Sequence, residues 1–583
     1  MDVANLIAGG SFLVSPSSPD DVYTPEDFSE EHRLIVRSLN AFLDAEIEPR
    51  AAELETHNFP LVRQLLRKLA TLGFLGVEIP EAYGGAGLDF ITSLLITETM
   101  SRGSFSVAFG AHTVIGTLPI AYFGTDEQKQ RYLPRLAAGE LIGAYALTEP
   151  TAGSDALAAR TRATRTEDAR AYLLTGTKQF ITNGGFADVF TTYAKVDGER
   201  FTSFIVDRET EGLAIGPEEH KMGIKGSSTT SLFFDNARVP AENLLGEIGA
   251  GHRVALNILN VGRLKLTTGC LGSAKRALRQ AIAYAGERRQ FGRAIASFGL
   301  IKQKLAQIAL RIYLLESLVY RTGGVIHSAR QTLETPAKAI EEYAVECAIG
   351  KVYGSEALAF VVDELVQIFG GYGYIEEYPA ARAYRDARIN RIYEGTNEIN
   401  RLLISGMLLR RAQRGRLPLI EAFKRAAETS ATDTRPAGAA ATAENGPLTD
   451  QWRQIEMAKH AALSVAGPAV LKYGETIQDQ QEVLAWIADL AIEIFAMESG
   501  LLRALRRKRL AEAQIDLVRA GVAEGLFRVE GLCRQVLAAT ADGDELRRRI
   551  AAMRHFLPDA RPDPVQLHRR IAERLLDAGA YVV

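Results

Sequence analysis

The chain has 583 residues, with 68 basic and 71 acidic side chains, and therefore a net charge of −3. Apolar residues make up 47% of it and charged residues 24%, which excludes a disordered chain, a collagen-like fibre and a protein with many membrane spans. The length predicts about three or four packed units, and the balanced charge argues against a nucleic-acid partner.

The cysteines and the N-terminus indicate the compartment. Cys270, Cys347 and Cys533 lie far apart without a CxxC spacing, so neither a disulfide framework nor a thiolate zinc site is expected. The first basic residue is Arg33, so the start lacks the charges of a secretory signal or a mitochondrial presequence. We expect a bacterial cytoplasmic protein with no metal site.

The first part of the chain, residues 24–140, predicts a helical domain. Thr125 and Gln128 have the spacing of a capping box at the start of a helix. Ile91, Leu94 and Leu95 have the spacing of one buried helix face.

The next part, residues 141–240, predicts a compact β domain. β-branched and aromatic residues dominate three short runs, 171–175, 189–193 and 202–206, and glycine-containing turns separate them. Residues 241–427 again have the pattern of helices, and we expect a third, helical domain there.

The C-terminal part begins with an Ala-, Thr-, Pro- and Gly-rich stretch, residues 428–450, which is typical of a linker. Residues 451–583 predict an additional helical domain, with a stripe at helical spacing formed by Val483, Ile487, Leu490, Ile494, Met497 and Leu501. Asp489 and Glu493 interrupt this stripe, so no membrane-spanning helix is expected.

A basic cluster follows the stripe: Arg503, Arg506, Arg507, Lys508 and Arg509. A basic cluster beside an apolar helix face suits peripheral membrane contact. The cluster equally suits a solvated helix end that the helix dipole favours. Both interpretations stay open.

Two polar segments of the β domain could contact a ligand. The loop 147–155 places hydroxyl groups and flexible backbone at a strand end, which suits a planar heterocycle and a phosphate. Phe180 and Thr182 are two residues apart, so on a strand they share one face and could stack on and hydrogen-bond a flavin. Taken alone, a loop such as 147–155 is more often a simple polar turn. A pair such as Phe180 and Thr182 more often belongs to the core of a hairpin.

The most informative segment is 391–399, in which Glu394 lies between apolar residues and Gly395. Thr396 has the position of a helix N-cap. Its apolar neighbours would desolvate Glu394 and raise its pKa, whereas the helix N-terminus would lower it. Such opposing effects suit a general base near neutral pH, although a lone Glu in a turn is usually solvated.

Together and in this order, these motifs resemble the acyl-CoA dehydrogenase family over about residues 25–415. Further motifs that carry the resemblance are 221–225, 288–292 and 367–371. The linker, the C-terminal extension, and segments 257–263 and 298–302 are similar to the very-long-chain branch. The resemblance implies an α+β chain: an N-terminal helical domain, a central β-barrel-like domain, a four-helix-type domain and an additional tethered helical domain.

The resemblance implies an FAD-dependent dehydrogenase of medium-to-long, possibly very long, acyl-CoA that forms trans-2-enoyl-CoA. In this family a base removes the α-proton in concert with β-hydride transfer to flavin N5. Glu394 matches that base. Some members carry the base just before the arginine that matches Arg263, but that position is Gly262 here.

Site residues follow from the same match. The implied FAD contacts are Tyr145, Leu147, Thr148, Ser154, Phe180, Ile181, Thr182, Arg288, Gln290, Phe291, Gln367, Gly370, Gly371, Thr396 and Glu398. The implied substrate contacts are Ser154, Asn260, Arg263 and Gly395, and the implied acyl-pocket walls are Phe105, Phe109 and Gly110. Many members have Trp at position 180, so Phe here changes the flavin packing.

The resemblance also implies partners. They are an acyl-CoA substrate, an electron-transferring flavoprotein as electron acceptor, and a second copy in a homodimer, from which Arg288, Gln290 and 367–371 would reach the neighbouring subunit's FAD. Peripheral membrane contact of the C-terminal domain remains an expectation. The alternative is a non-catalytic assembly or scaffold protein on the same fold. A DNA-binding relative is disfavoured by the charge, and a flavin oxidase by the Tyr-Glu-Gly sequence around Glu394.

Overall fold

The computed structural model describes residues 6–432, 446–507, 509–554, 556–557 and 562–583. Helices form the N-terminal part: α1 (Glu30–Phe42), α2 (Ala51–Leu54), α3 (Phe59–Thr71), α4 (Phe90–Met100), α5 (Ser104–Gly110), α6 (Leu118–Phe123) and α7 (Asp126–Ala137). The predicted capping box starts α7, where Thr125 Oγ1 accepts from the Gln128 amide. α4 is buried on more than the predicted face, since Phe90, Thr92 and Ser93 are buried too.

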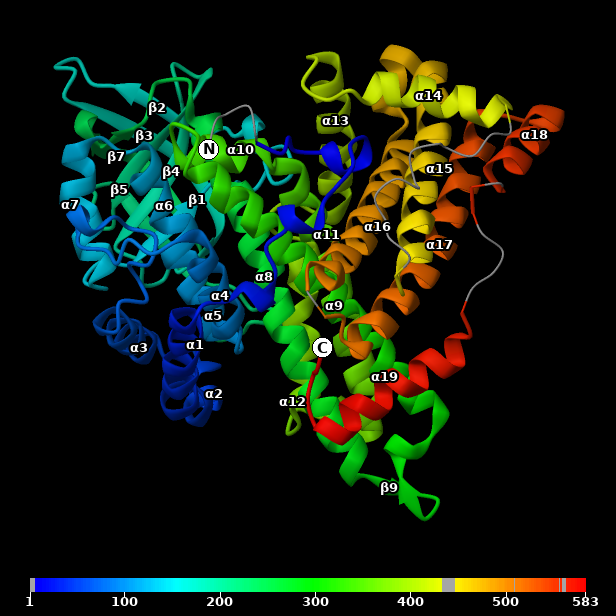
Figure 1. Ribbon diagram of the computed structural model, residues 1–583. Coiled ribbons are helices and arrows are strands. Elements are labelled where there is room, and N and C mark those ends of the chain that lie inside the picture. Colours follow the sequence, from blue (N-terminus) through cyan, green and yellow to red (C-terminus); the bar gives the residue numbers. More distant parts are fainter. Residues whose placement is uncertain (1–5, 433–445, 508, 555, 558–561) are drawn as a thin grey trace.

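The β domain is one eight-stranded sheet: β1 (Gly143–Ala146), β2 (Arg162–Arg165), β3 (Ala171–Thr182), β4 (Val189–Val196), β5 (Arg200–Asp207), β6 (Leu213–Glu218), β7 (Thr229–Pro240) and β8 (Leu244–Leu245). The strand order is β6-β7-β3-β2-β4-β5-β8, and β1 pairs in parallel with β4. The three predicted runs lie in β3, β4 and β5. In Figure 1 this domain lies on one side of the molecule and the long helices on the other.

Long helices build the third part: α8 (Gly251–Glu287), α9 (Gly299–Arg330), α10 (Pro336–Glu342), α11 (Ala344–Phe369), α12 (Pro379–Ala387), α13 (Asn397–Gln413) and α14 (Leu419–Thr432). A short hairpin of β9 (Arg289–Gln290) and β10 (Arg293–Ala294) follows α8. It projects from the end of the molecule far from the sheet (Figure 1). α14 extends into the predicted linker, and residues 433–445 lie outside the described residues.

The C-terminal helices are α15 (Thr449–Tyr473), α16 (Gln481–Arg506), α17 (Glu512–Thr540), α18 (Gly543–Arg554) and α19 (Pro564–Ala578). One apolar core runs without interruption from α8, α9 and α11 into α15, α16, α17 and α19. The stripe on α16 faces this core: Leu490, Ile494 and Met497 are buried. The additional domain therefore shares its core with the preceding helices and is held by more than its linker.

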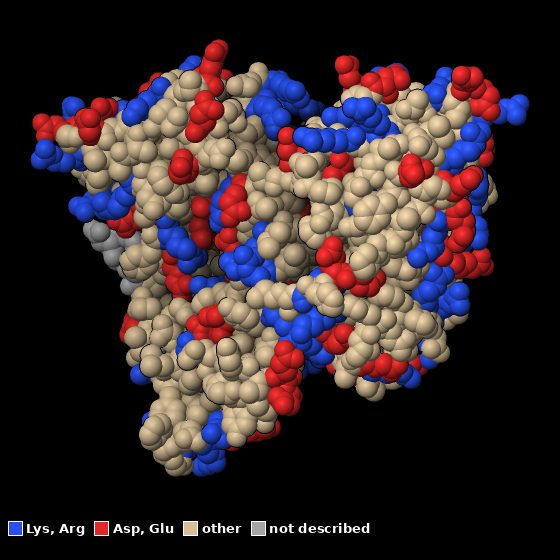
Figure 2. Space-filling model, turned by 180° about the vertical axis from the view of Figure 1, so that it is seen from behind, with Lys and Arg blue, Asp and Glu red and all other residues tan. Residues whose placement is uncertain are grey.

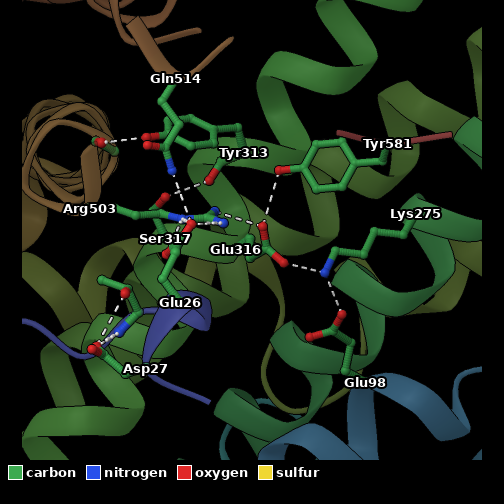
Figure 3. Close-up of polar contacts among 12 residues, drawn as sticks. Glu26, Asp27, Glu98, Lys275, Tyr313, Glu316, Ser317, Arg503, Gln514 and Tyr581 are labelled. Carbon is green, nitrogen blue, oxygen red and sulfur yellow. Dashed lines mark hydrogen bonds and ion pairs between the residues drawn. The ribbon is translucent and has the colours of Figure 1, made fainter. Parts of the chain in front are cut away.

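Arg503 of α16 is the centre of a buried ionic network at this junction (Figure 3). It donates to Glu26 near the N-terminus, with Nη2 to Oε1 at 3.0 Å, and to Glu316 of α9, with Nη1 to Oε2 at 2.7 Å. Glu316 also accepts from Lys275 and, at 3.1 Å, from the Tyr581 hydroxyl. The network joins both chain ends to the helical core.

These contacts remove Arg503 and Arg506 from the basic cluster on which the membrane interpretation rests. Arg503 is 3% exposed, and Arg506 forms an ion pair with Asp27 at 2.9 Å, so neither is a free cation. The solvated interpretation is also wrong for Arg503. The apolar face beside them is buried in the core. Arg507 and Arg509 are exposed, and Lys508 lies outside the described residues.

A segment outside the predicted C-terminal stripe is apolar over a length that could cross a membrane. Ser104–Phe123 is long and apolar enough, but 67% of it is buried inside the protein, as in the core helix of a folded domain. On the face seen in Figure 2, basic and acidic side chains are interspersed around a central hollow. Neither positive nor negative charge dominates that face.

Candidate active site

The turn before α13 holds Glu394 in an unusual backbone conformation. Its φ is +58°, and that of Gly395 is +80°. A non-glycine residue in this region is strained and persists only where its surroundings hold it. Asn400 Nδ2 donates to the carbonyls of Gly395 at 2.8 Å and Thr396 at 3.0 Å, and Arg263 Nε donates to the Glu394 carbonyl at 3.1 Å. These contacts hold the backbone of the turn in its strained conformation.

Thr396 caps α13 as the sequence predicts, since its Oγ1 accepts from the Ile399 amide at 3.3 Å. Asn260 accepts from Arg263 Nη1 at 2.7 Å, and both side chains are buried. The structure therefore brings together Glu394, Gly395, Thr396, Asn260 and Arg263. Glu398, the other predicted contact from this segment, is exposed.

The Glu394 carboxylate is poorly solvated. Within the described chain, its Oε2 atom is buried and has no hydrogen-bond partner. Burial raises its pKa to about 7, and the positive charges of Arg263 and Lys351 limit the rise. The predicted upward shift is confirmed, but the sequence did not indicate that two cations from other helices oppose it.

Gly262 on α8 provides the space that Glu394 occupies. A Cβ atom at Gly262 would lie 2.7 Å from Glu394 Oε2, which is closer than real contacts allow. The absence of a side chain at Gly262 therefore leaves room for the Glu394 carboxylate.

We expect Gly262→Ala to slow substrate-dependent flavin reduction by about a hundredfold, because a shift of about 1 Å in a catalytic group costs that much. FAD content and thermal midpoint should stay unchanged. Stopped-flow flavin absorbance measures the rate. Gly269→Ala on the same helix is the matched control, because its Cβ would meet Ser101 Oγ at an ordinary 3.4 Å. Equal rates in the two variants would contradict the prediction.

The two polar segments of the β domain lie side by side. The amide of Gln179 donates to the Thr148 carbonyl at 2.8 Å. Buried Lys178 donates to the Leu147 carbonyl at 3.1 Å and forms an ion pair with Glu149 at 2.7 Å. Because these contacts tie the loop to β3, the predicted residues at 147–148 and 180–182 form one surface.

The predicted flavin-stacking segment departs from a regular strand. The pairing register of β3 shifts between Lys178 and Ile181, and Phe180 has φ of +59°. Ile181 is buried, whereas Phe180 is 57% exposed and Thr182 is half-buried. A bulge thus presents an aromatic face and a hydroxyl group outward while the strand continues into the core.

The remaining predicted β-domain residues differ in exposure. Tyr145 is buried, with its hydroxyl 3.4 Å from the Ala255 carbonyl of α8, and the charge of Glu394 contributes to raising its pKa. Tyr145 thus links the β domain to the turn around Glu394. Leu147 is buried, and Ser154 is exposed.

The third predicted group lies at the other end of α8, near the β9–β10 hairpin and far from the sheet (Figure 1). Arg288 stacks over the Tyr372 ring at 5.5 Å, next to Gly370 and Gly371. Arg288, Gln290, Phe291 and Gln367 are exposed, with Phe291 at 92%. Within one chain this group does not meet Glu394 or Phe180.

Sequence reasoning missed Asn400 and Lys351. Asn400 follows the cap residue by one helical turn, and its amide spans the carbonyls of the Glu394 turn. Lys351 contacts Asn397, the first residue of α13. Only the short spacing of Asn400 from Thr396 was visible in the sequence, and no local signal placed Lys351 nearby.

Comparison with known proteins identifies the family. Four acyl-CoA dehydrogenase domain models match: the N-terminal domain at residues 29–140, the middle domain at 144–237, and two C-terminal domains at 249–409 and 457–555. The chain belongs to the acyl-CoA dehydrogenase family. The match to the second C-terminal model includes part of the helical extension, in agreement with the sequence prediction.

Individual relatives support the same assignment. A probable acyl-CoA dehydrogenase of Bacillus subtilis is 45% identical, and the match covers 100% of this chain and 99% of that protein. The human mitochondrial very long-chain specific acyl-CoA dehydrogenase is 36% identical, over 80% of this chain and 74% of that protein. A Bacillus anthracis acyl-CoA dehydrogenase complexed with FAD superposes with a TM-score of 0.96 at 44% identity, covering 99% and 100% of the two chains.

This family member is an oxidoreductase, and FAD is the cofactor of the Bacillus anthracis protein. The residues of this chain fit that cofactor. The bulge in β3 exposes Phe180 and Thr182 beside Thr148, whose loop is hydrogen-bonded to β3. The other phenylalanines of the β domain are mostly buried. An exposed aromatic ring next to hydroxyl and backbone groups is the chemistry that an isoalloxazine ring requires.

Proposed function

We propose that this acyl-CoA dehydrogenase converts medium-to-long acyl-CoA to trans-2-enoyl-CoA, with Glu394 as the base that removes the α-proton. The observation that carries the proposal is the buried, unpartnered Oε2 of Glu394, with a pKa near 7. A carboxylate in this state has lost the water that would otherwise stabilise it and can accept a proton from a weak carbon acid.

The surrounding residues orient this base. Arg263 and Asn400 hold the backbone carbonyls of the turn and so fix the backbone from which the carboxylate projects. We propose that the Glu394 amide donates a hydrogen bond to the thioester oxygen of the substrate. Asn260 and Arg263 supply polar groups for the substrate at the same place.

When bound, FAD supplies the hydride acceptor for the β-hydrogen. We propose that Tyr145, Leu147, Thr148, Ser154 and the segment Phe180–Thr182 hold the flavin half, with Thr396 and Glu398 contributing from α13. The bulge at Phe180 and its tie to Thr148 support this assignment.

The acyl chain would enter beside α5. Phe105 and Phe109 are buried there. A Cβ added at Gly110 would meet no atom within 4 Å, so open space adjoins this glycine. These features support the walls predicted from the sequence.

Anaerobic mixing with acyl-CoA thioesters of graded length tests the function. We expect flavin bleaching that depends on chain length and whose rate rises with pH through about 7, because only ionised Glu394 can accept the proton. Below that pH the carboxylate is protonated and the rate falls. A protein that binds FAD but is bleached by no acyl-CoA would instead support the scaffold alternative, which no observation here favours.

We also propose a homodimer in which the hairpin and its neighbours complete the partner's cofactor site. The exposure of Phe291 and Arg288, at the end of the molecule away from their own chain's sheet, supports this arrangement. An electron-transferring flavoprotein as acceptor, a cytoplasmic bacterial location and peripheral membrane contact through the C-terminal domain remain proposals that rest on the sequence.

We expect Arg288→Ala to lower FAD occupancy, because the guanidinium group would lose its contact with the cofactor pyrophosphate. The ratio of flavin to protein absorbance after dilution and gel filtration measures it. Arg162→Ala, an exposed substitution on β2, is the control. Full occupancy in Arg288→Ala would argue against an intersubunit cofactor contact.

A further inference from the structure

Lys351 of α11 is a buried cation held by a neutral group. Its side chain is 0% exposed, and its Nζ donates to Asn397 Oδ1 at 2.7 Å. Asn397 is the first residue of α13 and directly follows the turn that carries Glu394. An ammonium group has three donors, so this single neutral acceptor leaves most of its charge uncompensated.

The other buried lysines behave differently. Three more lysines are buried in the described part of the chain, and each forms an ion pair with a carboxylate: Lys178 with Glu149, Lys265 with Glu78, and Lys459 with Glu498. Such pairing is expected, because an isolated buried charge is costly. Among the described residues, Lys351 has no carboxylate partner of this kind.

The charged groups near Lys351 indicate which of them could offset its positive charge. Burial lowers the pKa of Lys351 to about 8, and Arg263 acts in the same direction. Cys270, Glu394 and Glu398 act in the opposite direction. Burial also raises the pKa of the Cys270 thiol to about 12, so it is neutral, and Glu398 is exposed to solvent, which screens it. Among these groups Glu394 is the carboxylate with a buried oxygen, and it lies in the turn directly before Asn397, the residue that Lys351 contacts.

Lys351 in turn acts on the pKa of Glu394. The cations that act on Glu394 are Arg263 from α8 and Lys351 from α11. The other titratable groups around it, Tyr145 of β1 and Tyr393 of its own turn, are phenols whose pKa burial raises, so they are neutral. Arg263 is already bonded to Asn260 and to the Glu394 carbonyl.

We propose that Lys351 is a positioning residue for the base: its bond to Asn397 anchors the start of α13 directly after the turn that carries Glu394, and its buried ammonium group, which has no carboxylate partner of its own, favours the ionised form of Glu394. The inference rests on the proposed role of Glu394. When Glu394 accepts the α-proton, Lys351 loses its compensating charge, and this favours return of that proton to solvent after turnover.

Two substitutions distinguish the effect of the Lys351 charge from the effect of its hydrogen bond to Asn397. Lys351→Gln removes the charge but keeps an N–H donor for Asn397, whereas Lys351→Met removes both. Ser355→Ala is the matched control, because Ser355 accepts from Asn397 Nδ2 at 3.1 Å and carries no charge. Each holoprotein is mixed anaerobically with a saturating acyl-CoA across pH 5.5 to 9.5, and the rate of flavin bleaching is fitted to a midpoint.

Removal of a nearby cation raises the pKa of a carboxylate. We therefore expect the midpoint to move up by about one pH unit in both Lys351 variants, with a rate at high pH close to wild type in Lys351→Gln. Ser355→Ala should keep the wild-type midpoint. A purely structural lysine would change the plateau or the thermal midpoint but leave the pH midpoint in place.

An unchanged midpoint in Lys351→Gln would overturn the proposal. So would failure of that variant to fold and bind FAD while Ser355→Ala does both, since Lys351 would then be structural. Glu394→Gln, measured in parallel, separates the two inferences. If Glu394→Gln is inactive and the Lys351→Gln midpoint is unchanged, the base assignment survives and only the role of Lys351 fails.

Discussion

Glu394→Gln should retain bound FAD and lose substrate-dependent flavin reduction by more than about a hundredfold, the lower range for loss of a general base. Gln has nearly the same shape and keeps the turn intact, so the loss reports the missing carboxylate. Stopped-flow absorbance gives the rate, and the flavin-to-protein ratio gives the FAD content. The pH dependence near 7 should disappear together with the carboxylate.

Glu421→Gln is the control for charge removal, because Glu421 is exposed on α14, away from the site. It should reduce FAD at the wild-type rate. Wild-type-like reduction in Glu394→Gln would remove the base assignment, and with it the mechanism.

Arg503→Met should destabilise the protein strongly, by about 3–5 kcal/mol, since it leaves buried carboxylates without their cation. Glu26 would lose its arginine contacts, and Glu316 would keep only Lys275 and Tyr581 (Figure 3). The change should appear as a lower thermal unfolding midpoint of the holoprotein and as easier proteolysis of the C-terminal helices.

Acid should weaken the same network. Lys275 and Arg503 hold the pKa of Glu316 below its ordinary value despite burial. A carboxylate with a lowered folded-state pKa contributes stability above its unfolded pKa, and this contribution is lost as the pH falls through the folded value. The destabilisation by Arg503→Met should therefore shrink in strong acid.

Arg547→Met is the matched control, because Arg547 forms an exposed pair with Asp544 in the same C-terminal region. Exposed pairs contribute little, so its unfolding midpoint should equal that of wild type. Equal midpoints for the Arg503 and Arg547 variants would show that the buried network does not hold the C-terminal helices in place.

Local sequence patterns predicted the elements, and the family resemblance pointed to Glu394 as the proposed base. Thr125 and Thr396 start helices because a hydroxyl side chain can satisfy the free amides of the first turn. The three β-rich runs became β3, β4 and β5. Glu394 stood out in the sequence because its apolar neighbours and the helix cap that follows it lie within three to five residues of it.

Other features depended on residues far apart in the sequence. The charge state of Glu394 is set by Arg263 and Lys351, and its position by Gly262 and Asn400. Arg503 looked like part of a solvent-exposed cluster because periodicity describes only its own helix. Its true environment comes from Glu26, which is separated from it by 477 residues.

The sequence by itself thus determined the order of helical and β segments, and through its family resemblance it singled out Glu394 as the proposed base. Only the tertiary structure decided how strongly that residue holds its proton and where the C-terminal helices attach. The physical reason is that backbone hydrogen bonding and capping act over one or two turns, whereas burial and Coulomb interactions act through space between segments whose proximity exists only in the folded chain.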